Sequence, residues 1–232
     1  SDMSVTLHNV TDTLTPDHEQ YDDALNAAAA AFLEAEALFD DGSFTAKEGW
    51  KKKGDDASIA IYVKSTPQGK LVAVSAILEC PVDDVMHETW TGLDSLPTWN
   101  TSINFAETVA VLSDNADIVR YGNNDVLIVT GREFLTARIY RKTVEGYIMA
   151  SRSVDLPEKP ENKNKVRAFM HLGASRFRAD PSNARRTLCD VVMLGDLRGS
   201  LPKTLVDSVM PTIMSMATEQ NVKHFKELGQ ST

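Results

Sequence analysis

The chain has 232 residues, of which 42% are hydrophobic and 25% are charged, and its formal net charge is -9. This composition is that of an ordinary globular protein and argues against disorder. Such an acidic chain is a poor candidate for nucleic-acid binding, because affinity for nucleic acids depends on neutralising their phosphates.

Two helices are predicted in the first half of the chain. Residues 1–17 are polar and rich in Thr and Asp, so we expect a loosely ordered arm there. Its first three residues, S-D-M, resemble a cloning remnant, and the natural chain is expected to be longer. Over residues 18–40 apolar side chains recur at helical spacing among alanines, which predicts a helix. A shorter helix is predicted to begin at Pro81, because proline and acidic residues favour the first helical turn.

Strand-forming segments alternate with turn-prone residues over much of the chain. The predicted strands cover residues 58–64, 71–78, 103–112, 116–121, 134–142, 146–153, 166–172 and 187–196. Sequential strands joined by short turns predict an antiparallel sheet. Helices kept to the ends of such a run predict an α+β architecture, with one curved sheet closed by a C-terminal helix. No repeat or linker divides residues 18–232, so we expect a single domain.

Motifs for catalysis or metal binding are missing from the sequence. The histidines are scattered, and G-x-S-x-G, P-loop and G-x-G-x-x-G patterns do not occur. Cys80 and Cys189 form neither a C-x-x-C motif nor a zinc cluster, and we interpret them as thiols in a reducing compartment. We therefore expect no metal and no cofactor. An enzyme whose catalytic residues converge from distant segments stays open.

An unusual apolar run follows the turn-prone residues 122–125. It consists of Val126, Leu127, Ile128 and Val129. The start of an ordinary strand would explain it. So would an apolar loop at the mouth of a cavity, which can insert its uncharged tip into a membrane interface.

A long amphipathic helix is predicted from about residue 202 to residue 228. Its apolar stripe carries methionines, which adapt to changing surfaces, and Pro211 within it predicts a kink. Core packing and a movable lid explain this stripe about equally well. The candidate cavity residues on the helix are Leu205, Val209, Met210, Ile213 and Met214.

Arg138 lies in a predicted strand and shares one face of it with Phe134 and Thr136, because side chains alternate along a strand. If this face is buried, the guanidinium needs a partner, either a carboxylate or a ligand hydroxyl through water. If it faces outward, Arg138 is solvated. Arg167 is a second candidate of the same kind.

Six groups of residues occur in an order that matches a known family. They are E-G-W-K-K (48–52), L-P-T-W-N (96–100), G-R-E-F (131–134) with A-R (137–138), S-V-D-L-P-E-K-P (153–160), V-R-A (166–168) and D-L-R-G-S-L-P-K (196–203). Together they make the chain resemble the START lipid-transfer domains, and within them the sterol- and carotenoid-binding branch of the steroidogenic acute regulatory proteins.

The resemblance implies a helix-grip fold, in which a curved antiparallel sheet and a long C-terminal helix enclose a hydrophobic tunnel for one lipid. It implies that the apolar run at 126–129 lies at the tunnel mouth and that Trp99 belongs to the wall. Arg138 matches the family's inward arginine, which pairs with an acid on the preceding strand in the sterol-binding branch. The position of that acid falls near Tyr121, so either Asp125 substitutes for it or the pair is absent.

The function that the resemblance implies is non-enzymatic transfer of one lipid between membranes. A sterol such as cholesterol is the first choice of ligand, a carotenoid the second and a phospholipid the third. A ligand-gated interaction module and an enzyme of the same fold group remain alternatives. We expect a monomer with transient membrane contact, in the cytoplasm or at the cytosolic face of mitochondria or late endosomes.

Overall fold

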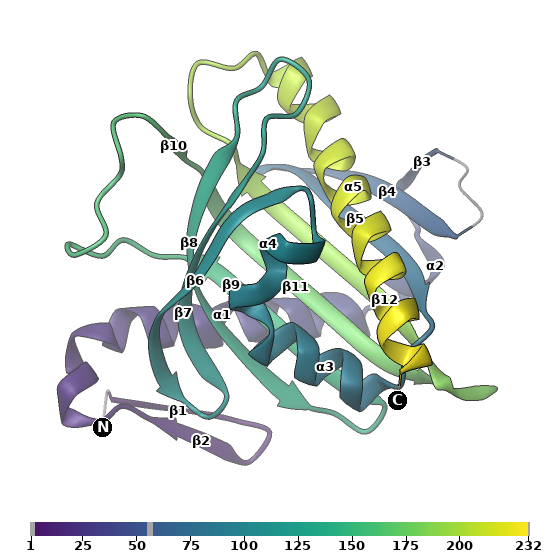
Figure 1. Ribbon diagram of the computed structural model, residues 1–232, viewed down its shortest axis with the longest axis horizontal. Helices are drawn as coiled ribbons and strands as arrows, with labels where there is room; N and C mark the ends of the chain where they lie inside the picture. Colours follow the sequence, from purple (N-terminus) through teal and green to yellow (C-terminus); the bar gives the residue numbers. More distant parts are fainter. Residues whose placement is uncertain (1–2, 55–57, 232) are drawn as a thin grey trace.

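A curved, mostly antiparallel sheet of ten strands wraps around the C-terminal helix in the computed structural model of this chain (Figure 1). The structure describes residues 3–54 and 58–231. Ser1 and Asp2, which belong to the expected cloning remnant, lie outside the described residues. The strand order in the sheet is β3-β4-β5-β12-β11-β9-β8-β7-β6, and β10 runs parallel beside β8.

Most of the predicted strands are present, but the strands over residues 4–7, 10–13 and 51–53 were not predicted, and the predicted segment 166–172 is divided between two strands. The strands are β1 (Ser4–Leu7), β2 (Val10–Thr13), β3 (Lys51–Lys53), β4 (Ile59–Thr66), β5 (Gly69–Leu78), β6 (Ile103–Ser113), β7 (Ala116–Asn123), β8 (Arg132–Lys142), β9 (Gly146–Ser153), β10 (Val166–Arg167), β11 (Phe169–Asp180) and β12 (Asn183–Asp196). The predicted loop over residues 178–186 is shorter than expected, because β11 and β12 continue to a tight turn at Pro181 and Ser182.

Helices cover both faces of the sheet. They are η1 (Pro16–Tyr21), α1 (Asp22–Asp40), α2 (Gly42–Ala46), α3 (Val82–Thr91), η2 (Leu93–Ser95), α4 (Leu96–Trp99) and α5 (Lys203–Gln230). In Figure 1, α1 lies behind the sheet, whereas α3, α4 and α5 lie in front of it. The sheet therefore has an outer face under α1 and an inner face toward α5.

Alternation along β8 assigns its side chains to these two faces. Leu135 and Ile139 are fully buried in the core with α1, where alanines allow the helix to approach the sheet closely. Phe134 belongs to the inner core with α5, and Arg138 points to the same face because the side-chain period of a strand is two. The sequence period thus places Arg138 on the inner face.

The N-terminal arm differs from the prediction. Instead of a loosely ordered segment, β1 and β2 form an antiparallel hairpin beside α1. Asp12 is buried and forms an ion pair with Arg141, whose Nε also donates to the Leu7 carbonyl at 2.9 Å. Leu7 and Leu14 of the arm are buried in the core with α1, and Asp12 finds its partner 129 residues away in the chain.

Three further features of the fold concern Pro211, the two cysteines and the length of the helices. The helix α5 continues without a break through Pro211. Cys80 and Cys189 are buried free thiols, and burial raises the pKa of Cys80 to about 11. Within the described residues, no helix has the length and apolar character needed to cross a membrane.

Candidate functional site

The inner face of the sheet and α5 enclose two adjoining chambers with mostly apolar walls. The sheet chamber has a volume of about 230 Å³ and lies between β7, β8, β9, β11, β12 and α5. The cap chamber has a volume of about 250 Å³ and lies under α3, η2 and α4. The chambers share five lining residues, Ile103, Tyr121, Met149, Ala217 and Asn221. We therefore treat them as parts of one tunnel.

Arg138 lines the cap chamber and has a carboxylate partner. Its Nε donates to Asp117 Oδ1 at 2.8 Å and its Nη2 donates to Asp117 Oδ2 at 2.7 Å. Each of the two side chains is 7% exposed, and the guanidinium also lies 4.3 Å from the centre of the Trp90 ring. This fork-to-fork geometry gives strong, charge-assisted hydrogen bonds and leaves the pair without net charge.

From the sequence we expected the acid's position to fall near Tyr121, with Asp125 as a possible substitute. The acid that pairs with Arg138 is at neither position. Asp117 lies directly opposite Arg138 in the register between β7 and β8. Asp117 and Tyr121 share one face of β7, because four residues separate them. The acid thus lies on the face that Tyr121 occupies, four residues before Tyr121 in the strand.

Tyr121 lies at the junction of the two chambers, where its ring stacks on Phe134 with the ring centres 5.1 Å apart. Burial raises the pKa of Tyr121 to about 12, although the nearby Arg138 guanidinium lowers it in part. The hydroxyl is consequently neutral and able to donate a hydrogen bond at neutral pH.

The C-terminal half of α5 is fixed to the short helices that cover the cap chamber. The rings of Trp99 and His224 stack with their centres 3.8 Å apart, and His224 Nε2 lies 3.1 Å from Glu88 Oε1. Trp99 and Phe225 both line the chamber. These contacts join α3, α4 and α5 at one end of the tunnel.

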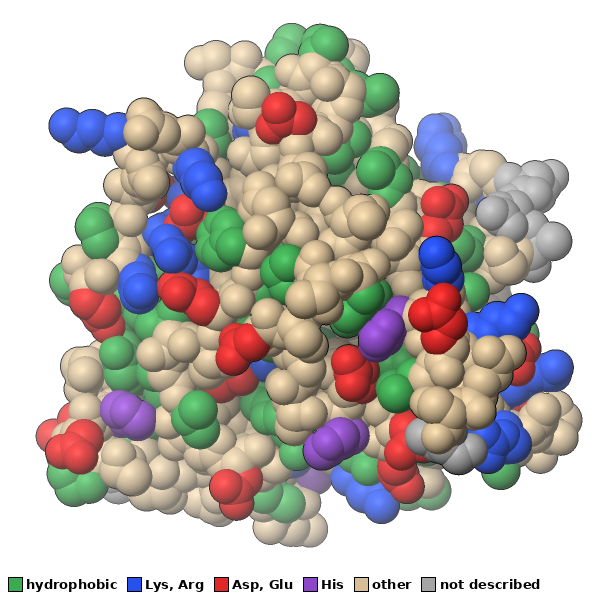
Figure 2. All heavy atoms as spheres, viewed as in Figure 1, with side chains coloured by type: hydrophobic (Ala, Val, Ile, Leu, Met, Phe, Trp, Pro, Cys, Tyr) green, Lys and Arg blue, Asp and Glu red, His purple; other side chains and the backbone are tan. Residues whose placement is uncertain are grey.

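The apolar run at 126–129 forms a tight loop between β7 and β8. Val126 and Val129 exchange backbone hydrogen bonds of 2.9 Å and are buried in the core with α5. Leu127 and Ile128 occupy the tip and are 75% and 84% exposed. Figure 2 shows hydrophobic side chains at the end of the molecule where Figure 1 places this loop and the start of α5.

Arg132 connects this loop to the segment that leads into α5, a role that we did not predict. Its Nη1 donates to the Thr130 carbonyl at 2.7 Å, and its Nε and Nη2 donate to the Leu197 and Arg198 carbonyls at 2.9 Å. Gly199 has φ of +77°, and a Cβ there would lie 3.1 Å from Arg132 Nη2. The G-R-E-F and D-L-R-G motifs carry this contact, and only the fold brings them together.

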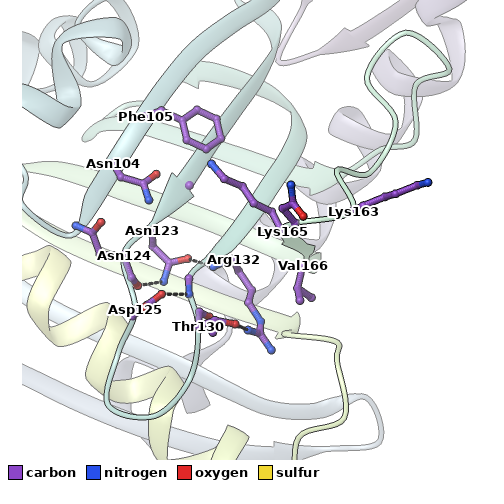
Figure 3. Close-up of a pocket in the computed structure, with 13 residues that line it drawn as sticks. Asn104, Phe105, Asn123, Asn124, Asp125, Thr130, Arg132, Lys163, Lys165 and Val166 are labelled. Carbon is purple, nitrogen blue, oxygen red and sulfur yellow. Dashed lines mark hydrogen bonds between the residues drawn. The ribbon is translucent and has the colours of Figure 1, made fainter.

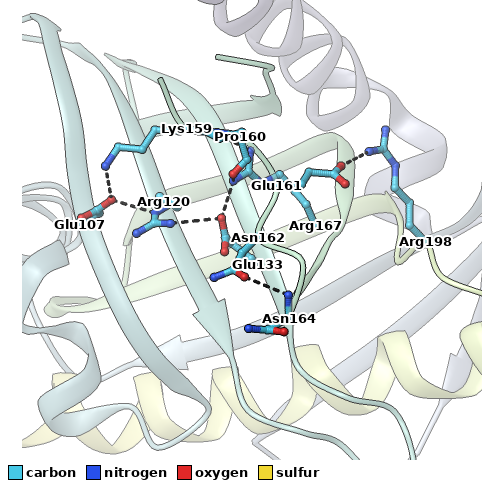
Figure 4. A network of polar contacts seen from close by, with 10 residues as sticks. All are labelled: Glu107, Arg120, Glu133, Lys159, Pro160, Glu161, Asn162, Asn164, Arg167 and Arg198. Carbon is cyan, nitrogen blue, oxygen red and sulfur yellow. Dashed lines mark hydrogen bonds and ion pairs between the residues drawn. The ribbon is translucent and has the colours of Figure 1, made fainter. Parts of the chain in front are cut away.

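Arg167 lines neither chamber. Its Nη2 donates to Glu133 Oε1 at 2.6 Å and its Nη1 donates to the Lys159 carbonyl at 2.6 Å. Figure 4 shows that Arg120 and Glu107 continue this network on the far side of Glu133. Arg167 thus ties the loop over residues 154–165 to the sheet rather than facing the tunnel.

Asp125 also lies away from the tunnel, in a separate polar groove of about 680 Å³ (Figure 3). Its Oδ1 accepts from the Gly131 N–H at 2.7 Å and so closes the base of the loop. Asn123, two residues earlier, makes a similar contact, because its Oδ1 accepts from the Arg132 N–H at 3.0 Å. Both side chains therefore stabilise the base of the loop.

The remaining predicted residues divide into two groups. Phe134, Ile213 and Met214 line the sheet chamber. Val209 and Met210 are buried in the core between α5 and the sheet, and Leu205 packs at its edge. Thr136 is buried between Phe134 and Arg138 on β8 and lines neither chamber.

A family model described as the START domain matches residues 31–231 of the chain. The chain belongs to the START domain family. Steroidogenic acute regulatory-like protein 1 of Caenorhabditis elegans is 49% identical over 97% of this chain and 88% of that protein. The human steroidogenic acute regulatory protein, mitochondrial, is 21% identical over 73% of this chain, which spans only about 61% of that relative's length.

Solved structures of START domains share the fold of this chain. The human StAR-related lipid transfer protein 5 has a TM-score of 0.77 at 18% identity and covers 90% of this chain and 99% of its own. Human STARD10 has a TM-score of 0.71, also at 18% identity, and covers 84% of this chain and 78% of its own. The predicted α+β helix-grip fold is confirmed, and family membership supports lipid binding and transfer as the class of function.

Proposed function

We propose that this START domain carries one sterol in the tunnel formed by the sheet and cap chambers and transfers it between membranes without catalysis. The observation that carries this proposal is a tunnel with mostly apolar walls in which Asp117 neutralises the charge of Arg138. Burial of apolar ligand area supplies about 25 cal/mol per Å², which drives uptake of a hydrophobic molecule.

The size and polarity of the tunnel favour a sterol over a phospholipid. Neither chamber alone reaches the roughly 300–1,000 Å³ of typical ligand sites, but the two joined into one tunnel do. A phosphate headgroup is bound most strongly by positively charged donors. Asp117 already neutralises Arg138 in the cap chamber, so a mostly apolar ligand with a small neutral polar group fits better.

Membrane contact is assigned to the tip of the β7–β8 loop. Leu127 and Ile128 are uncharged and mostly exposed, so their insertion into a membrane interface would bury apolar area without burying a charge. Because the chain carries a net charge of -9, apolar insertion suits it better than attraction to anionic lipids.

Lipid exchange requires an opening, and we propose that the β7–β8 loop and α5 provide it by moving together. Val126 and Val129 pack into the same core as Val209 and Met210, and Arg132 joins the base of the loop to the lead into α5. These contacts support a single moving unit. We further propose that the domain acts as a monomer at the cytosolic face of mitochondria or late endosomes.

The first experiment is native mass spectrometry of the purified protein, followed by organic extraction and identification of the bound molecule. The proposal expects one sterol per chain and transfer of radiolabelled cholesterol between vesicles. A stoichiometric carotenoid or phospholipid would replace the ligand but keep the carrier. Failure to take up sterols, carotenoids or phospholipids would contradict the carrier and favour an enzyme or a ligand-gated interaction module.

A further inference from the structure

Two polar side chains border the junction of the chambers from opposite walls. Tyr121 reaches it from β7 and Asn221 reaches it from α5, and both line both chambers. Asn221 continues the row formed by Ile213 and Ala217 at intervals of four residues, so it occupies a position of α5 that faces the tunnel. An apolar residue would be expected there if the helix only packed against a core.

Neither polar group has a hydrogen-bond partner among the described residues. Two other polar side chains of the sheet chamber do have a partner. The Thr218 hydroxyl donates to the Met214 carbonyl at 2.7 Å, and the Ser151 hydroxyl donates to the Gly173 carbonyl at 3.3 Å. Tyr121 and Asn221 are half-buried, and a ligand that fills the chambers would cover both side chains. Because polar groups removed from water are nearly always paired, the Tyr121 hydroxyl and the Asn221 amide then need a partner on that ligand.

The ion pair at Arg138 is a poorer anchor for such a partner. Asp117 occupies two nitrogens of the guanidinium and balances its charge, so binding there gains no net electrostatic attraction. The groups at the junction are in contrast neutral and uncommitted. An amide offers both an acceptor oxygen and donor hydrogens, and a phenol donates readily, so the two can accept from and donate to one hydroxyl.

We propose that Tyr121 and Asn221 form the polar anchor of the ligand and together bind a single neutral hydroxyl group of a sterol at the junction of the two chambers. This inference rests on the proposed sterol carriage and adds the subsite that selects the ligand. The hydroxyl donates to Asn221 Oδ1 and accepts from the Tyr121 hydroxyl. A hydrocarbon of the same shape leaves both groups unpaired and binds less tightly for that reason.

The test compares cholesterol with 5α-cholestane, which has nearly the same shape and no hydroxyl. Each ligand is equilibrated with the full chain from cyclodextrin, and the bound amount is determined by mass spectrometry. The preference for cholesterol is the ratio of bound cholesterol to bound cholestane, corrected for the partitioning of each into cyclodextrin. In the wild-type protein we expect a clear preference for cholesterol.

The Tyr121→Phe and Asn221→Leu variants should each reduce this preference by about five- to tenfold, as expected for loss of one neutral hydrogen bond. Their affinity for cholestane should stay the same or rise. Thr218→Val is the matched control, because that hydroxyl is already bonded within α5. It should shift the affinity for both ligands equally. Because two independent variants are used, misfolding of one leaves the test intact.

Three outcomes would overturn the inference. If both variants keep the wild-type preference, the anchor is elsewhere and the inference is wrong, while sterol carriage stands. If the preference falls only when Asp117 and Arg138 are replaced together by Leu and Met, the hydroxyl binds at the ion pair, and the inference is again overturned. If the wild-type protein takes up neither molecule, sterol carriage fails and the inference fails with it.

Discussion

Asp117 and Arg138 face each other across β7 and β8 and share two hydrogen bonds of 2.8 and 2.7 Å inside the protein. Two charges removed from water gain little net stability even when well paired. Removing only one of the two residues is costly, however, because it leaves the other charge buried and unpaired. We therefore expect that the two residues can be replaced together but not one at a time, and the first prediction tests this.

Replacing Asp117 with Leu alone should lower the free energy of unfolding by about 3–5 kcal/mol, because it leaves the Arg138 guanidinium buried and unpaired. The double variant Asp117→Leu with Arg138→Met should recover most of that loss, since it removes both charges. Urea denaturation of the two single variants and the double variant measures the coupling. A single variant as stable as the wild type would show that Arg138 is solvated.

The exposed tip of the β7–β8 loop predicts a transfer defect without a stability defect. Replacing both Leu127 and Ile128 with Glu should slow sterol transfer between vesicles at least about tenfold, because burying each aliphatic side chain gains roughly 1.5–3 kcal/mol. Denaturation should be unchanged, since both side chains are mostly exposed. Val144→Glu, at a fully exposed position in the turn between β8 and β9, is the control and should transfer normally.

Arg132 provides a test of the opening. Lysine keeps the charge but cannot reach the Thr130, Leu197 and Arg198 carbonyls at once, because it lacks the planar fork. Arg132→Lys should therefore speed ligand release and increase hydrogen exchange over residues 124–131 and 197–205. Stability should fall by about 1–3 kcal/mol. If the ligand is released at the wild-type rate although hydrogen exchange increases, the β7–β8 loop does not take part in the opening.

Tyr121 predicts a loss of stability at alkaline pH. The unfolded chain gives up this phenol proton near the ordinary pKa of 10, whereas the folded protein keeps it up to a pKa of about 12. The folded state thus binds more protons between pH 10 and 12, so stability falls as pH rises through this window, by about 1.4 kcal/mol per unit from this group. Tyr121→Phe should flatten the measured decline. Part of it should remain, because the pKa of Tyr147 is also raised to about 12.

Regular alternation explains why so much of the fold could be predicted from sequence. The pattern of Phe134, Thr136 and Arg138 placed the arginine on one face of a strand, and β8 has that face turned inward. Short turns between strands predicted neighbours in the sheet. The N-terminal hairpin was missed because its contacts, among them the packing of Leu7 against the core and the pair of Asp12 with Arg141, are with residues far away in the chain and have no local signal.

The sequence by itself determined most of the elements, the α+β class and the family, because these depend on local periodicity and on motifs whose residues are neighbours in the chain. Only the tertiary structure decided which groups meet in the tunnel. It paired Arg138 with Asp117 instead of Asp125, turned Arg167 toward Glu133, and brought Asn221 opposite Tyr121. Strand register and helix packing set these distances, and both result from long-range burial that no short segment of sequence encodes.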